Sequence, residues 1–339
     1  MIEVSEAYNN KAVARLNKQA WVQAGTAVNA GSASEAARQA GLDWTVSDKP
    51  LFAEIEPASI DMHGVSQALY KQVTNRNAMV RNDTNEIIGV VGDKYKIVQN
   101  MEVFSALDTL VDSGDARYTA AGEYNNGANI WMVMELPVGV QVANDPHAAF
   151  LLVQSSHDGS CAVRIRPIIE RLYCMNQVNR IIKGKHRNDY TYTMKHTTNS
   201  QLSVADIRNI TQLTYDSIGE YEAVASTLLG RKVDDRQVRN IFKAVWSLPT
   251  TVEEMPEHLL SQGEKRQRTI ALAGRESAWS IYSESPTQEN IRGTAFGAWQ
   301  AVIEHADHRA SGGSDRRAIA TISGRNDRIK DKALELVLA

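Results

Sequence analysis

Between residues 78 and 166, short apolar segments alternate with turn sequences, and this pattern constrains the fold more than any other feature of the chain. Asn82–Asn85 has the composition of a hairpin turn between two strand-like segments. Asn125-Asn-Gly127 supplies the residues with positive φ that a tight hairpin needs. The sequence therefore predicts an antiparallel meander with strands at Ala78–Arg81, Glu86–Val91, Arg117–Tyr124, Ala128–Leu136, Ala148–Ser155 and Cys161–Arg166.

Helices are expected around and after this meander. Met101–Val111 has a helical pattern, and Pro167 suits the first turn of a second helix that runs to about Ile182. After residue 200 the apolar residues follow helical spacing, beginning with a helix capped by Ser203 and Asp206. The predicted fold class is α+β, with an antiparallel β-meander packed with helices and then an all-helical C-terminal half.

Three regions are predicted along the chain. Residues 1–75 form an N-terminal arm with a short helix and a strand, and within them Gly25–Ser34 has the composition of a linker. Residues 76–200 form the α+β core domain. Residues 201–339 form a helical C-terminal region that ends in a basic tail.

The composition limits the class of protein. Of the 339 residues, 43% are hydrophobic and 23% are charged, which excludes a collagen-like or disordered chain. Cys161 and Cys174 cannot form a disulfide framework and match no zinc spacing. There is no apolar run of the roughly 20 residues that cross a bilayer, and the N-terminus does not resemble a secretory signal. We expect a soluble protein with no membrane partner, located in the cytoplasm of a bacterial host.

Charge is distributed unevenly along the chain. The net charge of −3 combines −8 over residues 1–160, +6 over residues 161–196 and −1 over residues 197–339. A basic segment in an otherwise acidic protein is typical of a local anion-binding site. A second basic stretch, Arg309–Lys332, has seven cations against three aspartates, and its glycines suggest a mobile arm that closes over a polyanion. A solvated terminal helix after a flexible loop is the alternative.

Several short motifs follow one another in a characteristic order: Val80–Asp83, Gly89–Tyr95, Gln99–Asn100, Ala121–Gly122, His157–Ser160, Arg171–Asn176 and Gly293–Trp299. Their order resembles the phage/plasmid-like protein family, a domain of unknown function carried by bacteriophages and mobile plasmids. The similarity covers most of residues 20–338, although Cys174-Met-Asn-Gln177 departs from the Cys-Gln-Asn-Thr-like turn of that family. The expected helix–meander–helix order at 101–182 is also similar to the core of single-strand annealing recombinases.

The basic segment predicts a nucleic-acid site. Arg164 and Arg166 lie two apart on an expected strand and so project from one face. Single-strand binders combine a positive groove with aromatic side chains on which bases stack. Cations near the end of a helix can instead simply complement its dipole. The predicted nucleic-acid-binding residues are Arg164, Arg166, Arg171, Arg180, Lys183, Lys185, Arg187, Tyr190, Tyr192 and Lys195.

No catalytic or metal-binding motif is recognised. His157-Asp-Gly-Ser160 contains a base and a nucleophile but no serine-hydrolase elbow, and it is interpreted first as a turn. His305 and His308 are spaced to share a metal, but a third ligand is not evident from the sequence. Gly89-Val-Val-Gly92 lacks the ending of a nucleotide-binding phosphate loop. We therefore expect no metal and no cofactor.

The leading hypothesis is a non-enzymatic protein of a phage or mobile element that binds single-stranded DNA. It would promote strand annealing without ATP, as a homo-oligomer. One alternative is a metal-dependent nuclease or hydrolase built on His157, Asp158 and neighbouring acidic residues. Another is a protein-binding module that counters host defence, in which the acidic first half of the chain occupies a basic DNA-binding surface.

Overall fold

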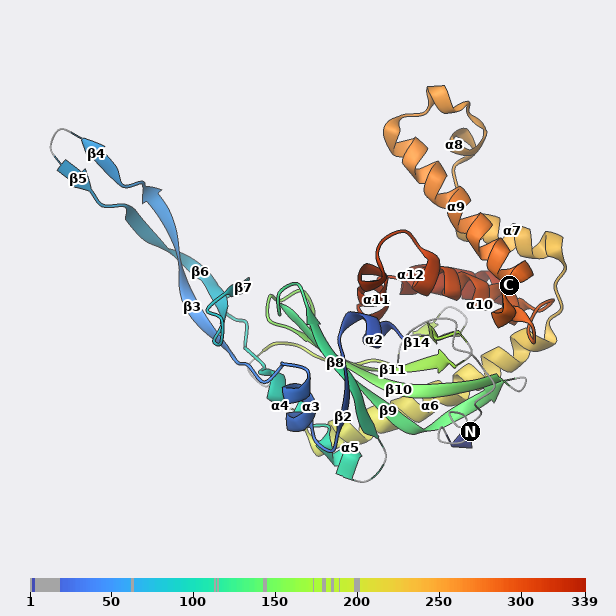
Figure 1. The fold of residues 1–339 in the computed structure, drawn as a ribbon, viewed down its shortest axis with the longest axis horizontal. Helices are drawn as coiled ribbons and strands as arrows, with labels where there is room; N and C mark the ends of the chain where they lie inside the picture. Colours follow the sequence, from blue (N-terminus) through green and yellow to red (C-terminus); the bar gives the residue numbers. More distant parts are fainter. Residues whose placement is uncertain are drawn as a thin grey trace.

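An antiparallel sheet that contains the last four strands of the predicted meander lies at the centre of the molecule (Figure 1). The first two predicted strands, Ala78–Arg81 and Glu86–Val91, belong instead to a separate three-stranded sheet. The computed structural model describes residues 2–3, 19–61, 64–112, 114, 116–142, 145–172, 174–178, 181–183, 186–188, 190–197 and 202–339. Across the sheet the described strands follow the order β12 (Asn176–Val178), β11 (Val163–Arg171), β10 (Asp145–Ser156), β9 (Asn129–Val142), β8 (Arg117–Tyr124) and β2 (Thr26–Ala30), with β1 (Ile2–Glu3) paired to β9 and β15 (Tyr192–Met194) paired to β11.

Both faces of this sheet are buried, as the alternation of side chains along β10 illustrates. Ala149, Leu151 and Val153 face the larger hydrophobic core, whereas Phe150 and Leu152 face a smaller one. A strand covered on both sides needs apolar residues at every position, which explains the continuous apolar run in this part of the sequence.

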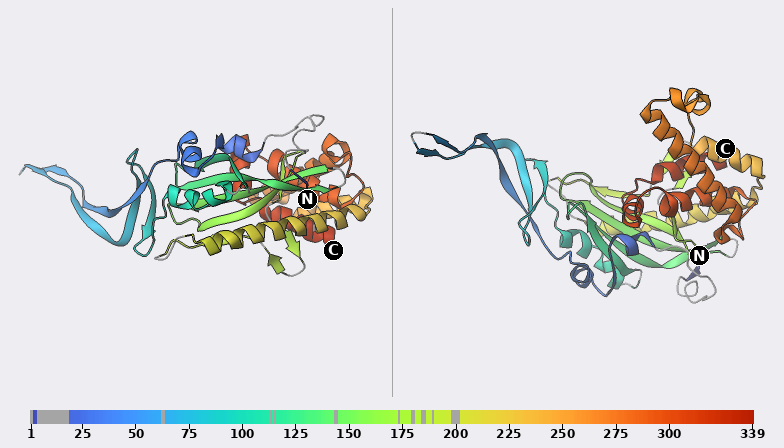
Figure 2. Two further views of the ribbon diagram at one scale, coloured as in Figure 1. Left: turned by 90° about the horizontal axis from the view of Figure 1, so that it is seen from below. Right: turned by 45° about the horizontal axis from the view of Figure 1, so that its top comes forward.

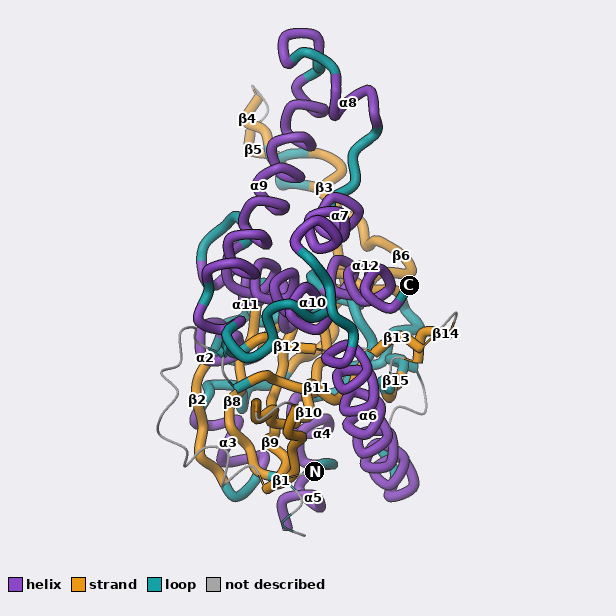
Figure 3. Tube along the Cα trace, turned by 90° about the vertical axis from the view of Figure 1, so that its right-hand side faces the viewer, coloured by secondary structure: helices purple, strands orange, loops and turns teal. Residues whose placement is uncertain are grey.

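Different helices cover the two faces. On the larger core lies α6 (Val204–Gly230), which runs along one side of the sheet (Figures 2 and 3). On the smaller core lie α2 (Ala20–Ala24) and α11 (Ser314–Ile322), which contribute Trp21 and Ile322. Side chains of the remaining longer helices join the larger core, namely α3 (Ala33–Gln39), α4 (Asn100–Ser105), α7 (Asp235–Val245), α9 (Gln262–Glu284), α10 (Ala295–Glu304) and α12 (Asp327–Leu338).

Short elements complete the described chain. The π-helical turn His305–Arg309 continues α10. The remainder are α5 (Asp108–Asp112), α8 (Thr250–Glu254), the 3-10 turns Glu257–Leu259 and Pro286–Gln288, and the small hairpin of β13 (Ile181–Lys183) and β14 (His186–Asn188).

A long β-ribbon leaves the body of the molecule. It is built from β3 (Val46–Glu56) and β6 (Leu69–Arg81), with β7 (Ile87–Gly92) paired to β6 near its base. The short strands β4 (Ser59–Asp61) and β5 (Gly64–Ser66) form its tip (Figure 1). We call residues 46–92 the arm. The turn between β6 and β7 is the one expected from Asn82–Asn85, whereas the length of the ribbon was not predicted.

The α+β fold class is confirmed, with antiparallel sheets followed by a helical C-terminal half. The predicted caps of α6 are also confirmed, since Ser203 accepts a hydrogen bond from the Asp206 backbone N–H and the Asp206 side chain accepts one in return. The predicted helix at 101–111 is interrupted and forms α4 and α5. No helix in the part of the chain that the structure describes combines the length and hydropathy needed to cross a bilayer.

The helix predicted from Pro167 to Ile182 is wrong, because β11 continues through Pro167 to Arg171. On one side Pro167 pairs with Leu151 of β10. On the other side, the β15 ladder ends at Ile165 and the β12 ladder begins at Ile169. Pro167 thus occupies a gap between two short partner strands, where its missing N–H removes no ladder hydrogen bond.

The linker predicted at Gly25–Ser34 is also wrong, because this segment contains β2, the edge strand of the main sheet. Gly25 is needed for packing and not for flexibility. A Cβ atom at this position would lie 2.4 Å from Cζ2 of Trp131 and 2.6 Å from the Ala121 carbonyl oxygen. Glycine at position 25 allows the backbone that leads into β2 to pack closely against Trp131 of β9 and Ala121 of β8.

Candidate nucleic-acid interface

A polar groove forms where the two basic segments of the sequence meet. Its volume is about 240 Å³, and its lining comes from β11, β15 and the turn between α11 and α12. The sheet pairing places Arg164 beside Gln154 and Arg166 beside Leu152, so both arginines project from one face as predicted. The lining residues are Arg164, Arg166, Thr191, Thr193, Ser323, Gly324 and Asp327.

Arg166 joins the sheet to the C-terminal helices. Its Nη1 lies 3.1 Å from Oδ2 of Asp327, and its Nη2 donates a 2.6 Å hydrogen bond to the carbonyl oxygen of Ile322. Gly324 has a φ of +77°, and a Cβ there would lie 2.9 Å from Arg166 Nη1. The turn between α11 and α12 therefore needs glycine both for its backbone conformation and for close contact with Arg166.

Exposed cations lie on the elements that line the groove. Arg164 is exposed on the sheet, while Arg325 is exposed on the turn and Arg328 on the first turn of α12. Burial raises the pKa of Tyr124 to about 12, and the positive charges of Arg325 and Arg166 oppose this rise. Guanidinium groups beside threonine and serine hydroxyls are donors of the kind that bind phosphate oxygens.

Two other predicted residues are buried away from this surface. Arg171 is 1% exposed and forms an ion pair with the buried carboxylate of Asp145. Tyr190 is 8% exposed, and its phenol donates a hydrogen bond to Glu220. The prediction that these side chains contact nucleic acid conflicts with this burial, because a base or phosphate cannot reach them without displacing the core.

The remaining predicted residues are dispersed. Tyr192 pairs with Ile165 and packs on the larger core, so its ring is on the opposite face of the sheet from Arg164. Lys195 is exposed just after β15. The backbones of Lys183 and Arg187 belong to the β13–β14 hairpin, but their side chains lie outside the described structure. Arg180 and Lys185 lie outside the described residues altogether.

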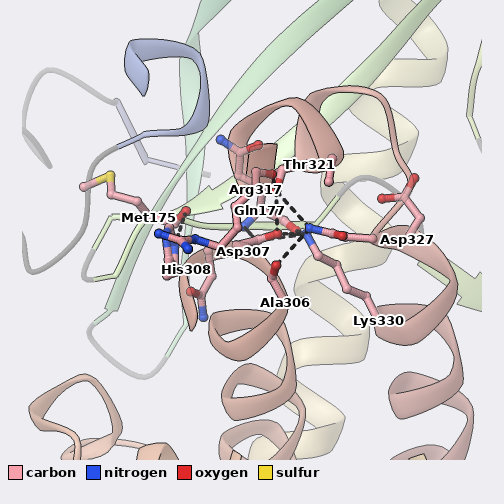
Figure 4. Close-up of polar contacts among 12 residues, drawn as sticks. Met175, Gln177, Ala306, Asp307, His308, Arg317, Thr321, Asp327 and Lys330 are labelled. Atoms are coloured by element: carbon pink, nitrogen blue, oxygen red, sulfur yellow. Dashed lines mark hydrogen bonds and ion pairs between the residues drawn. The ribbon is translucent and has the colours of Figure 1, made fainter. Parts of the chain in front are cut away.

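The second basic stretch forms one wall of the groove, in the helices α11 and α12. A buried polar cluster fixes this wall to the sheet (Figure 4). Lys330 Nζ donates a 2.7 Å hydrogen bond to the Gln177 carbonyl oxygen and lies 2.6 Å from Oδ1 of Asp307. Asp307 also accepts hydrogen bonds from the Gln177 N–H at 3.0 Å and from the Thr321 hydroxyl at 2.9 Å. The mobile arm that the glycines suggested therefore does not fit Arg317–Lys332, which packs as helices.

Sequence reasoning missed this cluster. Asp307, Asp327 and Lys330 are charged residues on helices whose other faces are apolar. Such residues are normally solvated, and nothing in their spacing distinguishes a solvated face from a buried ion pair.

The His157–Ser160 segment forms the predicted turn. The carboxylate of Asp158 accepts a 2.8 Å hydrogen bond from the Ser160 N–H. His157 is fully buried, its Nε2 lies 2.8 Å from Oδ1 of Asn100, and burial lowers its pKa to about 4. A neutral imidazole held in this way supports the turn.

The two histidines at 305 and 308 contact different partners. Nε2 of His308 lies 3.2 Å from the Met175 carbonyl oxygen, and the ring of His305 packs edge-on against Trp246. Among the residues that the structure describes, no three His, Cys, Asp or Glu side chains gather in a group that could hold a metal ion. The metal-dependent alternative remains a prediction.

Comparison with protein-family models gives one match. A model described as a domain of unknown function, DUF932, matches residues 87–333, which include the main sheet from β8 onward and both walls of the groove. Searches of curated proteins and of solved structures find no match. Because the matched region is well over half of the chain, the protein belongs to the DUF932 family.

Proposed function

We propose that this protein binds single-stranded DNA through its phosphates at the groove between β11 and the α11–α12 turn, acting without ATP and as a homo-oligomer that promotes strand annealing. The observation that carries the proposal is the meeting of Arg164 and Arg166 of β11 with the α11–α12 turn, about 160 positions away in the sequence, at one polar groove. A basic patch of this kind is the expected electrostatic footprint of a polyanion site.

The residues of the groove have separable roles in this proposal. Arg166 is already engaged by Asp327 and the Ile322 carbonyl, so it holds the wall in place. The exposed Arg164 and Arg325 supply the positive charge that a phosphate meets. Thr193, which pairs with Arg164 on the same face of the sheet, supplies a neutral donor.

The size of the groove favours a single strand. A volume of about 240 Å³ fits a phosphodiester group with part of its sugar and cannot enclose a double helix. A flexible single strand can turn one phosphate into a groove of this size, whereas the backbone of a duplex is too stiff to bend a single phosphate inward.

The test is binding of a fluorescent single-stranded oligonucleotide, followed by anisotropy over a range of salt concentrations. Replacing Arg164 and Arg325 together by alanine is expected to weaken binding at low salt at least about tenfold and to reduce the slope of log affinity against log salt by about 1.4, since each phosphate contact contributes about 0.7 for single strands. The matched control is Arg208→Ala, which removes an exposed arginine from α6 on the opposite face of the sheet.

Three results would contradict the proposal. The first is no binding by the wild-type protein at low salt. The second is equal loss of affinity in the control and in the double variant, because the effect would then reflect total charge. The third is tighter binding to duplex than to single-stranded DNA of the same length.

A further inference from the structure

The arm exposes apolar side chains that nothing in the described structure covers. Of the large hydrophobic side chains exposed in the described part of the chain, half lie on three strands of the arm, β3, β6 and β7: Phe52, Ile55, Leu69, Tyr70, Ile87 and Val90. A single-layered ribbon has no second layer to bury such residues, and where it has only two strands it is marginally stable by itself. Gathered apolar residues on an extended element indicate an interaction surface.

The outer strand of the arm combines these apolar groups with negative charge. We call Leu51–Glu56 the arm strip; its sequence is LFAEIE, with two carboxylates and no cation. Phe52 and Ile55 are 54% and 55% exposed. Glu54 accepts a hydrogen bond from the Tyr70 hydroxyl of the neighbouring strand at 3.2 Å. A partner for this strip must therefore present apolar side chains next to positive charges.

A surface with this chemistry projects from the other end of the molecule. The first half of α9 extends away from the helical region (Figure 1). We call Lys265–Leu272 the α9 strip; its sequence is KRQRTIAL, with three cations and no acid. Ile270 and Leu272 are 53% and 46% exposed. Arg268 donates to the Met255 carbonyl oxygen, while Lys265 and Arg266 make no ion pair within the described structure.

We propose that the arm strip of one copy of this chain binds the α9 strip of a second copy. The two strips complement each other in charge, and one face of each combines an exposed apolar side chain with a charge. On the arm strip this face holds Phe52 and Glu54, two positions apart on β3. On the α9 strip it holds Ile270 and Arg266, one helical turn apart. Within one molecule they lie at opposite ends and cannot meet (Figure 1). The contact is therefore made between molecules and is heterologous, which generates a ring if the rotation closes and a filament if it does not.

This inference rests on the homo-oligomer of the proposed function and names its interface. Each copy in a head-to-tail assembly keeps its own groove, because the groove lies on β11, β15 and the α11–α12 turn and includes neither strip. Repetition of the groove from copy to copy provides successive phosphate sites for one strand of DNA.

A charge-reversal experiment on the full chain tests the interface. The arm variant contains Glu54→Lys and Glu56→Lys, and the α9 variant contains Lys265→Glu and Arg266→Glu. Mass is measured by light scattering after size exclusion over a range of protein concentrations. Each variant alone is expected to associate at least tenfold more weakly than the wild type. An equimolar mixture is expected to recover association, because every arm strip then finds an α9 strip of opposite charge.

Matched controls separate the interface from general charge effects. Glu284→Lys with Glu289→Lys matches the net charge change of the arm variant, and Arg208→Glu with Arg236→Glu matches that of the α9 variant. All four side chains are exposed and lie outside both strips, and both controls are expected to associate like the wild type. Phe52→Ser and Ile270→Ser test the same contact without changing charge, and each is expected to weaken association. Circular dichroism melts on all variants show that the fold is retained.

The possible outcomes are distinguishable. A wild-type protein that stays monomeric at every concentration overturns both the interface and the proposed homo-oligomer. Association that is unaffected by the reversals, or that the mixture does not restore, overturns the arm-to-α9 contact alone. Anisotropy with a short oligonucleotide, measured on the same variants, reports separately on the groove, and its loss in the wild type would count against DNA binding and not against the interface.

Discussion

Removing the carboxylate of Asp327 tests whether the wall of the groove depends on its ion pair with Arg166. The side chains of Arg166 and Asp327 are 8% and 4% exposed, so neither charge is solvated by bulk water. In Asp327→Ala the guanidinium remains buried and keeps its hydrogen bond to the Ile322 carbonyl oxygen, but it loses the carboxylate of Asp327.

The expected cost follows from this burial. Removing one partner of a buried ion pair costs about 3–5 kcal/mol, because the other charge is left uncompensated. The retained hydrogen bond to Ile322 places Asp327→Ala near the lower limit, at about 3 kcal/mol in the free energy of unfolding. Adding Arg166→Met removes the stranded charge, so the double variant is expected to be more stable than Asp327→Ala alone.

Urea denaturation followed by circular dichroism measures these free energies, and oligonucleotide anisotropy on the same samples measures the groove. We expect Asp327→Ala to weaken oligonucleotide binding, because the turn carrying Arg325 loses its attachment to the sheet. A loss of stability below about 1 kcal/mol, as for an exposed ion pair, would refute the argument. The argument would also be refuted if the double variant lost more stability than the two single variants lose in total, because the coupling between the two changes would then have the wrong sign.

Two further predictions concern stability. Gly25→Val is expected to destabilise the fold by about 1–3 kcal/mol or more, because the new side chain is overpacked against Trp131. Gly31→Ala is expected to cost less than about 1 kcal/mol, because a Cβ atom there meets no atom within 4 Å. Similar denaturation midpoints for the two variants would contradict this packing. Burial lowers the pKa of His157 to about 4 from an ordinary value of 6.5, so the unfolded chain binds the proton more tightly. The contribution of His157 is therefore fully present above about pH 6.5 and is lost as the pH falls toward 4, by up to about 3 kcal/mol. Urea denaturation at pH 7.5, 6, 5 and 4 should show a shallower decline in His157→Gln than in the wild type, and parallel declines would contradict the assignment.

Local elements could be read from the sequence because their causes are local. The hairpin at Asn125-Asn-Gly127 forms because all three residues adopt positive φ, as such a turn requires. The capping of α6 by Ser203 and Asp206 involves atoms within four positions of one another. The helical C-terminal half follows from side-chain spacing along single helices. None of these features depends on a distant part of the chain.

The helix expected after Pro167 shows where local reasoning stops. Proline suits the first turn of a helix, but it also suits a strand position where no partner needs its N–H. Only the sheet, which places β12 and β15 on either side of that position, decides between the two. The length of the arm was not predicted for a related reason. Its apolar residues are typical of strands that a second layer covers, and only the fold shows that here they are exposed.

The sequence by itself determined the α+β class, the main turns, the helix caps and the uneven distribution of charge. Tertiary structure alone decided which charges are available at the surface. Arg171 and Arg164 are equivalent in the sequence, yet one is enclosed with Asp145 and the other faces the groove. Burial depends on which distant segments pack above each strand. For the same reason, only the fold brings the α11–α12 turn, carrying Arg325, against Arg166 of β11.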